Sequence, residues 1–362
     1  MNRFQGRLAV QQRVLPSYRV PFFDLLASAC DGGMSLFTGL PRPSEGIATA
    51  NQLKIVQYTQ GQNLHLFGGS FYLCYQGGLM DWLEKSNPDA LIVEANPRYL
   101  STPSAVRWMH KRKRPVLGWG LGSPPIRGFL KQRRASFIKQ FDAMIAYSRR
   151  GSDEYAALGF PREKIFVAYN SVSAQPEEPL PGRSWTQDQR PYILFVGRLQ
   201  ARKRIDSLLR ASAQLSPKPR LVIVGDGPEK QSLKSLAAEI YPQAEFVGAK
   251  HGVELKPYFT KANLFVLPGT GGLAVQEAMS YGLPVIVAQG DGTQDDLVRK
   301  ENGWQIPSGN FDALLNTMRD ALSDAARLNR MGEEAYRIVK EEINIEMMAG
   351  TFVTALNALT GK

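Results

Sequence analysis

Short apolar stretches alternate with helical stretches through most of this 362-residue chain. The expected strands of the first half are 6–10, 34–39, 53–58, 90–95, 115–120, 143–148 and 164–169. Those of the second half are 192–197, 220–225, 245–248, 263–268 and 284–288. This alternation is typical of parallel sheets with helices on both faces. We therefore predict an α/β fold built from doubly wound sheets.

Two domains are expected, because the chain is longer than one hydrophobic core usually serves. Residues 171–191 contain four prolines and no hydrophobic period, which indicates a linker. We place the domains at 1–172 and 191–344, with a linker at 173–190 and a final helix, 345–362, packing back on the first domain. Two Rossmann-like domains of this kind are expected to face each other across a cleft at the carboxyl ends of their strands.

The composition favours a cytoplasmic location. No run of 18 apolar residues is present, and the N-terminus lacks the apolar segment of a signal peptide. Cys30 and Cys74 stand in apolar surroundings and are expected to be buried thiols.

Positive charge is concentrated between residues 101 and 150, where twelve Lys and Arg residues stand against one acid, Asp142. Such a field attracts the phosphates of nucleic acid, anionic lipid or a lipid-linked substrate. A helix over 126–141 would place Ile126, Leu130, Phe137 and Phe141 near one face among cations. It either lies on anionic lipid at the inner face of the cell membrane or packs with a solvated basic face. Nucleic acid is not an expected partner, because no helix-turn-helix, zinc spacing or RNP-like aromatic pattern is present.

The segment 263–285 reads as a strand, a glycine turn and a helix. Gly269, Gly271 and Gly272 break the strand, and Glu277 lies in the helix that follows. Such turns leave backbone N–H groups for an anion, and a carboxylate one turn further on can accept hydrogen bonds from sugar hydroxyls. An ordinary connection between a strand and a helix has the same pattern.

Two further turns follow strands in the same half of the chain. Arg198 and Lys203 follow a strand that ends at Gly197, and two cations at this spacing can clamp a diphosphate. Solvated loop charges are the alternative for this motif taken alone. The second turn, Gly225-Asp226-Gly227-Pro228, is common in proteins and indicates little by itself.

Together these segments resemble the donor-binding domain of retaining GT-B glycosyltransferases, in particular glycosyltransferase family 4. The matching elements are VGRLQARK, VGDGPEKQSL, FVG at 246–248 and LPGTGGLAVQEAMSYGLPVI, in the family's order across about 190–310. The resemblance implies a retaining hexosyltransferase with a donor-binding second domain and an acceptor-binding first domain. It also implies a nucleotide diphosphate sugar as donor. A UDP-sugar is expected rather than a GDP-sugar from family frequency, and UDP-glucose is the particular donor expected. The acceptor is expected to be a growing cell-surface or exopolysaccharide glycan that is lipid-linked.

The resemblance also implies roles for individual residues. Arg198 and Lys203 would neutralise the leaving diphosphate in place of a metal, so no metal or other cofactor is expected. Glu277 would hold the ribose. The remaining donor-site residues are expected at Gly197, Gly227, Val247, Lys250, Gly271, Gly272, Leu273 and Ala274.

The first domain matches the family more loosely. Tyr18 and Arg19 in LPSYRVPFF resemble the loop that opens the acceptor side. Residues 141–172 resemble the family's run into the linker, in which Ser148 and Asn170 are expected to be structural. VEANPRY at 93–99 closes a strand, so Glu94, Asn96 and Arg98 either reach the substrate or form a capping turn with a solvated arginine.

Two positions depart from the family pattern. Gly269 stands where a second glutamate is usual, and Leu121 stands where a histidine usually meets the donor sugar. The three histidines of the chain, His65, His110 and His251, lie elsewhere and are expected to be surface or packing residues. Either other residues such as Glu94, Asn96 or Arg98 replace these two groups, or the chain is a weak or inactive nucleotide-sugar-binding subunit of a glycan-assembly complex.

Overall fold

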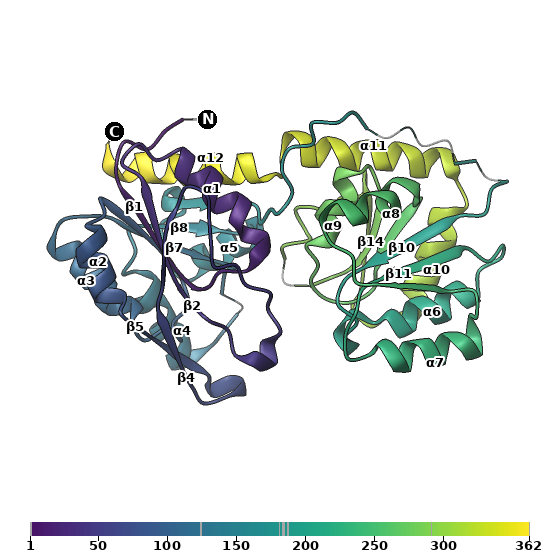
Figure 1. Ribbon diagram of the computed structural model, residues 1–362, viewed down its shortest axis with the longest axis horizontal. Coiled ribbons are helices and arrows are strands. Elements are labelled where there is room, and N and C mark those ends of the chain that lie inside the picture. Colours follow the sequence, from purple (N-terminus) through teal and green to yellow (C-terminus); the bar gives the residue numbers. More distant parts are fainter. Residues whose placement is uncertain are drawn as a thin grey trace. The chain divides into compact units, whose positions relative to one another are not determined.

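The computed structural model describes residues 2–123, 125–180, 182, 185–186, 188–290 and 292–361 (Figure 1). The chain forms two compact units. Unit 1 runs up to Val172 and takes in the chain from Ile345 onward, and unit 2 is Ser173–Asn344. Residues 181, 183, 184 and 187 of the predicted linker lie outside the described residues.

Unit 1 is built on a parallel sheet in the order β3-β2-β1-β6-β7-β8-β9. Its strands are β1 (Leu8–Val14), β2 (Met34–Gly39), β3 (Gln57–Gln60), β6 (Ala90–Glu94), β7 (Val116–Gly120), β8 (Ala143–Ala146) and β9 (Ile165–Val167). An antiparallel hairpin, β4 (Gln62–Leu66) and β5 (Leu73–Gly77), follows the edge strand β3. Apart from this hairpin, the strand order is that of a Rossmann fold.

Helices cover both faces of this sheet. They are α1 (Val20–Ser28), α2 (Leu79–Ser86), α3 (Thr102–Lys111), α4 (Gly128–Ile138), α5 (Arg149–Ala157) and α12 (Ile345–Thr360). Leu8 and Val10 of β1 pack in the core that contains α1 and α12, whereas Ala9 packs in the core on the α2 and α3 side. The strand is apolar on both faces because successive side chains point to opposite faces.

The last helix, α12, packs on α1 within unit 1 (Figure 1). The ring of Phe352 lies 5.1 Å from that of Phe22 and 4.9 Å from that of Trp119, centroid to centroid. Both contacts are edge-on, an arrangement that aromatic rings favour. The final segment therefore completes the core of unit 1.

Unit 2 repeats the architecture with the sheet order β12-β11-β10-β13-β14-β15. Its strands are β10 (Tyr192–Val196), β11 (Arg220–Val224), β12 (Glu245–Gly248), β13 (Leu264–Leu267), β14 (Val285–Ala288) and β15 (Gly303–Ile306). Its helices are α6 (Ile205–Ala213), α7 (Lys230–Ile240), α8 (Lys256–Lys261), α9 (Ala274–Ser280), α10 (Phe311–Leu322) and α11 (Ala325–Glu341). This is again the Rossmann order, with the order reversing between β10 and β13.

The predicted α/β class with doubly wound sheets is confirmed. Sequence reasoning missed the hairpin β4–β5 and the short edge strand β15, and it placed β3 about four residues too early. The expected apolar face of residues 126–141 is wrong. Phe137 and Phe141 are buried in the core, whereas Leu130 is exposed, because α4 packs against unit 1 only through its C-terminal end.

Candidate functional site

Most of the predicted donor-site residues of unit 2 follow neighbouring parallel strands. Gly197 and Arg198 follow β10, Gly227 follows β11, and Lys250 follows β12, in which Val247 lies. The segment from Gly269 to Ala274 follows β13 and leads into α9, which contains Glu277. Since these strands are adjacent and parallel, their carboxyl ends meet at one edge of the sheet, where open α/β sheets bind their ligands.

The loop after β10 and the loop after β11 contact each other at glycine residues. A Cβ atom at Gly225 would lie 1.9 Å from the Gly197 carbonyl oxygen, and one at Gly227 would lie 2.3 Å from that of Leu199. Both glycines hold positive φ angles, 150° and 158°. The Leu199 N–H donates to the Asp226 carbonyl at 2.8 Å. The glycines are therefore needed for the backbone approach that joins the loop after β10 to the loop after β11.

Gly269 makes a third close approach. A Cβ atom there would lie 2.1 Å from the Arg202 carbonyl oxygen and 2.5 Å from the Cα atom of Lys203. The Thr270 N–H donates to that same carbonyl at 3.0 Å. Position 269 thus has no room for a side chain of any kind, because the backbone at Arg202 and Lys203 packs directly against it.

Lys203 is buried, with 6% of its surface exposed. Its ammonium donates to the Thr270 carbonyl at 2.8 Å and to the Gly271 carbonyl. Burial, reinforced by the nearby charge of Arg202, lowers the pKa of Lys203 to about 8. The structure therefore brings Lys203 to the glycine turn. Its ammonium group contacts the turn and loses its proton more readily than that of an ordinary lysine.

The other predicted donor-site residues are more open. Arg198 is exposed, and the Lys250 ammonium pairs with Glu254 at 3.3 Å. Burial raises the pKa of Glu277, whose side chain lies one turn into α9. Hydrogen-bond donors on a ligand would favour the charged carboxylate and offset this shift.

On unit 1, the three residues expected at 93–99 lie at the end of β6. Burial raises the pKa of Glu94, and among the described residues its Oε2 atom has no hydrogen-bond partner. The Asn96 side chain accepts a hydrogen bond from the Arg98 N–H at 3.1 Å, which closes a local turn. Arg98 itself is exposed. The structure thus supports the capping turn for Asn96 and leaves Glu94 as a buried carboxyl group with an unsatisfied oxygen.

Tyr18 and Arg19 have different environments although they are adjacent. Tyr18 is exposed, whereas Arg19 is buried and donates to the Ser171 carbonyl at 3.1 Å and to the Asn170 side chain. Arg19 therefore ties the start of α1 to the end of unit 1's main segment. The predicted structural role of Asn170 agrees with this contact. Leu121, the position of the missing histidine, is exposed after β7.

A polar cluster beside Glu94 was missed from the sequence. Arg13, at the carboxyl end of β1, pairs with Glu45 at 2.8 Å. Gln11 on the same strand bonds to Gln76 of the hairpin, and its Oε1 atom accepts from the Glu94 N–H at 3.3 Å. The signal for it is the polar run Gln11-Gln12-Arg13, which closes an otherwise apolar strand.

The cavity of about 610 Å³ in unit 1 lies elsewhere, between β2, β3 and α2. Its walls include Phe37, Gln57, Thr59 and Trp82. None of the predicted acceptor residues lines it.

The fold and these loops define a protein of the GT-B class, with two Rossmann-like α/β domains. HepE of Anabaena, solved in complex with UDP, has the same fold, with a TM-score of 0.72 and 16% identity over 99% of this chain and 100% of that one.

Sequence comparison narrows the class. Residues 180–338 match the family model described as glycosyl transferases group 1. A GDP-mannose-dependent alpha-mannosyltransferase of Mycobacterium tuberculosis is 38% identical over 47% of this chain and 45% of that protein. The lipopolysaccharide core biosynthesis glycosyltransferase LpsE of Rhizobium meliloti is 21% identical over 76% of this chain and 87% of that protein. The chain spans less than half the length of the mannosyltransferase. These findings support the group 1 glycosyltransferase family, and the segment that matches the family model lies entirely within unit 2.

The described residues include no helix that is both long enough and apolar enough to cross a lipid bilayer.

Proposed function

We propose that this chain is a retaining glycosyltransferase of family 4 that moves a hexose from a nucleotide diphosphate sugar to a lipid-linked, growing glycan. The observation that carries the proposal is the meeting of the loops after β10 and β13. There the buried Lys203 ammonium bonds to the carbonyls of Thr270 and Gly271. The match of residues 180–338 to the group 1 family supports the same activity.

Arg198 and Lys203 supply positive charge for the leaving group. When the bond from the sugar to the diphosphate breaks, its electron pair leaves with the diphosphate. Fixed cations aimed at this developing charge lower the barrier, and a buried ammonium is more effective than one in water. Glu277 would hold the ribose hydroxyls, and Val247 and Lys250 would flank the base. The site would then need no metal.

Two nucleotide sugars, a UDP-sugar and a GDP-sugar, are the candidate donors. UDP-glucose, the expectation from family frequency, gains no support from the sequence relatives. The mannosyltransferase named above uses GDP-mannose, and its 38% identity favours a GDP-sugar. HepE, which shares the fold at 16% identity, was solved with UDP. We therefore propose GDP-mannose as the first donor to test and UDP-glucose as the second.

Calorimetric titration of the full chain with UDP, GDP, UDP-glucose and GDP-mannose tests this assignment. We expect saturable binding of one nucleotide sugar and its loss in a variant carrying Arg198→Ala and Lys203→Ala. Absence of binding to all four compounds would refute the proposal.

A second candidate is a nucleotide-sugar-binding subunit without transferase activity. Gly269 favours it, because the backbone of Arg202 and Lys203 fills the space in which a second carboxylate would stand. Release of free nucleotide from the bound donor, measured with and without a membrane extract that contains acceptors, separates the candidates. A transferase releases nucleotide faster with the extract, whereas a binding subunit shows no release in either case.

The expected place of action is the cytoplasmic face of the cell membrane, with peripheral attachment. Residues 101–150 contain twelve Lys and Arg residues and one acidic residue. This positive charge supports the proposed attachment, because anionic lipid attracts basic segments.

A further inference from the structure

The hairpin β4–β5 of unit 1 carries apolar side chains on its outward face. In its register Leu64 lies opposite Tyr75, and Leu66 lies opposite Leu73. These residues share one face, because side chains alternate along a strand. Three of them, Leu64, Leu66 and Tyr75, are exposed. The hairpin therefore presents an apolar face to solvent.

The other face of the hairpin is polar and attaches it to unit 1. The Asn63 side chain donates to the Arg13 carbonyl at 2.7 Å, and the Gln76 side chain donates to the Gln12 carbonyl at 3.1 Å. This arrangement inverts the usual one, in which apolar residues face the core. Packing inside unit 1 does not account for these apolar side chains.

The tip of the hairpin carries two highly exposed aromatic side chains. Phe67 is 72% exposed and Phe71 is 81% exposed. Phe67 also holds a φ of 58°, which non-glycine residues rarely adopt. No Asp, Glu, Lys or Arg occurs between Lys54 and Asp81. A cation from outside the hairpin, Arg42, contacts the tip: its guanidinium donates to the Phe67 carbonyl at 3.4 Å and lies 4.2 Å from the centre of the Tyr72 ring. A cation at this place can meet anionic headgroups while the aromatic rings enter the interface.

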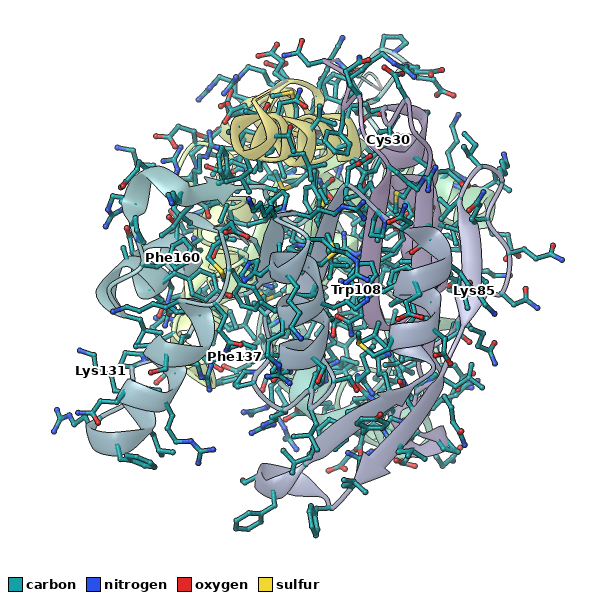
Figure 2. All side chains as sticks on the ribbon, turned by 90° about the vertical axis from the view of Figure 1, so that its left-hand side faces the viewer. Cys30, Lys85, Trp108, Lys131, Phe137 and Phe160 are labelled. Atoms are coloured by element: carbon teal, nitrogen blue, oxygen red, sulfur yellow. The ribbon has the colours of Figure 1, made fainter. Side chains whose placement is uncertain are left out.

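The free end of α4 is a second projection of the same kind. Phe129 and Leu130 in its first turn are 69% and 63% exposed, while Phe137 near its end is buried. Lys131 and Arg133 beside them are exposed, and the Arg133 guanidinium lies 5.7 Å from the centre of the Phe129 ring. Figure 2 shows Lys131 on the outer part of α4 and Phe137 nearer the body of the unit. In both views α4 and the hairpin extend from the same lower edge of unit 1 (Figures 1 and 2).

We propose that the hairpin β4–β5 is a membrane-insertion element that docks unit 1 on an anionic lipid bilayer together with the first turn of α4. Aromatic side chains settle at the boundary between headgroups and acyl chains. Cations beside them are drawn to anionic headgroups, and stable peripheral attachment usually needs both signals. The hairpin supplies apolar side chains, and the first turn of α4 supplies both apolar side chains and cations.

A second copy of the chain is a poorer occupant of this edge. A symmetric contact through the same patch would bring two strongly basic surfaces together, and like charges across an interface oppose association. An anionic bilayer can bind both parts of the surface, because its headgroups attract the cations of α4 and its apolar interior accepts the tip of the hairpin. This docking gives the proposed peripheral location a definite surface, and its test does not depend on sugar transfer.

Co-flotation of the full chain with vesicles tests the proposal. We expect binding to vesicles of phosphatidylcholine with phosphatidylglycerol, and little binding to phosphatidylcholine alone. Replacing both tip residues, Phe67→Ala and Phe71→Ala, should reduce partitioning at least about tenfold, since each change removes a large apolar side chain from the interface. The replacements Lys131→Gln and Arg133→Gln should weaken binding to the anionic vesicles and reduce its dependence on salt.

The control is Val253→Ala, because Val253 is an exposed apolar residue of unit 2. It should leave vesicle binding unchanged. Nucleotide titration should give wild-type values for every variant, which separates this proposal from the donor assignment and shows that the variants are folded. Equal flotation of the wild type and the Phe67/Phe71 double variant would overturn the proposal. A dimer seen by light scattering that the double variant abolishes, with vesicle binding unchanged, would instead identify a second copy as the occupant.

Discussion

The buried ammonium of Lys203 gives the proposed donor site a pH dependence that can be calculated. With a pKa of about 8, the group is mostly charged at neutral pH and mostly neutral one unit above this pKa. A diphosphate prefers the charged form. If only that form binds, the apparent dissociation constant rises by about tenfold between about pH 7 and about pH 9. The direction follows from the lowered pKa, because a lysine with an ordinary pKa would stay charged throughout this range.

Replacing Lys203 with Met tests the same charge directly. Methionine keeps an unbranched side chain but removes the charge and its hydrogen bonds. A charge-assisted hydrogen bond contributes about 1.5–3 kcal/mol, so we expect roughly 10- to 150-fold weaker binding of the nucleotide sugar. The part of the pH dependence that comes from Lys203 should disappear in the same variant, and only the titration of the ligand itself should remain.

The assay is calorimetric titration of the nucleotide sugar at several pH values, with Lys300→Met as the matched control. The Lys300 side chain is 92% exposed in unit 2, so its loss should change neither the affinity nor its pH dependence. Wild-type affinity that is constant from neutral pH to about pH 9 would refute the reasoning, because a pKa of about 8 requires most of the charge to be lost there. So would a Lys203→Met variant with unchanged affinity.

Three further predictions concern single side chains. Gly269→Ala should destabilise unit 2 by about 1–3 kcal/mol and weaken nucleotide binding, because its Cβ atom would overlap the Arg202 carbonyl; a normal urea midpoint with normal affinity would contradict the close approach. If Glu277 holds the ribose as proposed, Glu277→Gln should weaken nucleotide-sugar binding roughly tenfold, because the hydrogen bonds to the ribose would lose their charge, and it should leave inorganic pyrophosphate binding unchanged. Equal loss for both ligands would place Glu277 at the phosphates. Phe352→Ala should cost about 3–5 kcal/mol in urea unfolding, because this fully buried ring packs against Phe22 and Trp119; a loss below about 1 kcal/mol would show that α12 adds little to unit 1.

Sequence pattern predicted the two sheets well because parallel strands buried on both faces are continuous apolar runs. The stretch Leu91 to Val93 and the stretch Leu264 to Leu267 are of this kind, and both became central strands. The hairpin β4–β5 also alternates and has a glycine turn, so a signal for it was present. Its apolar face points to solvent, and only the polar contacts of Asn63 and Gln76 with β1 reveal this. Such contacts join residues far apart in sequence and cannot be inferred from local periodicity.

The candidate site was predicted residue by residue, but its internal packing was not. Spacing identified Arg198, Lys203 and the glycine turn, because each follows the end of a strand. From the sequence, Gly269 is interpreted as a position at which this chain lacks the glutamate that is usual in the family. In the structure the glycine is what allows the backbone at Arg202 to approach, so that Lys203 can reach the carbonyls of Thr270 and Gly271. The same contact buries Lys203 and lowers its pKa. Gly269, the first of the two departures from the family pattern, therefore has two effects: it leaves no room for a carboxylate at position 269, and it allows the contact that holds Lys203.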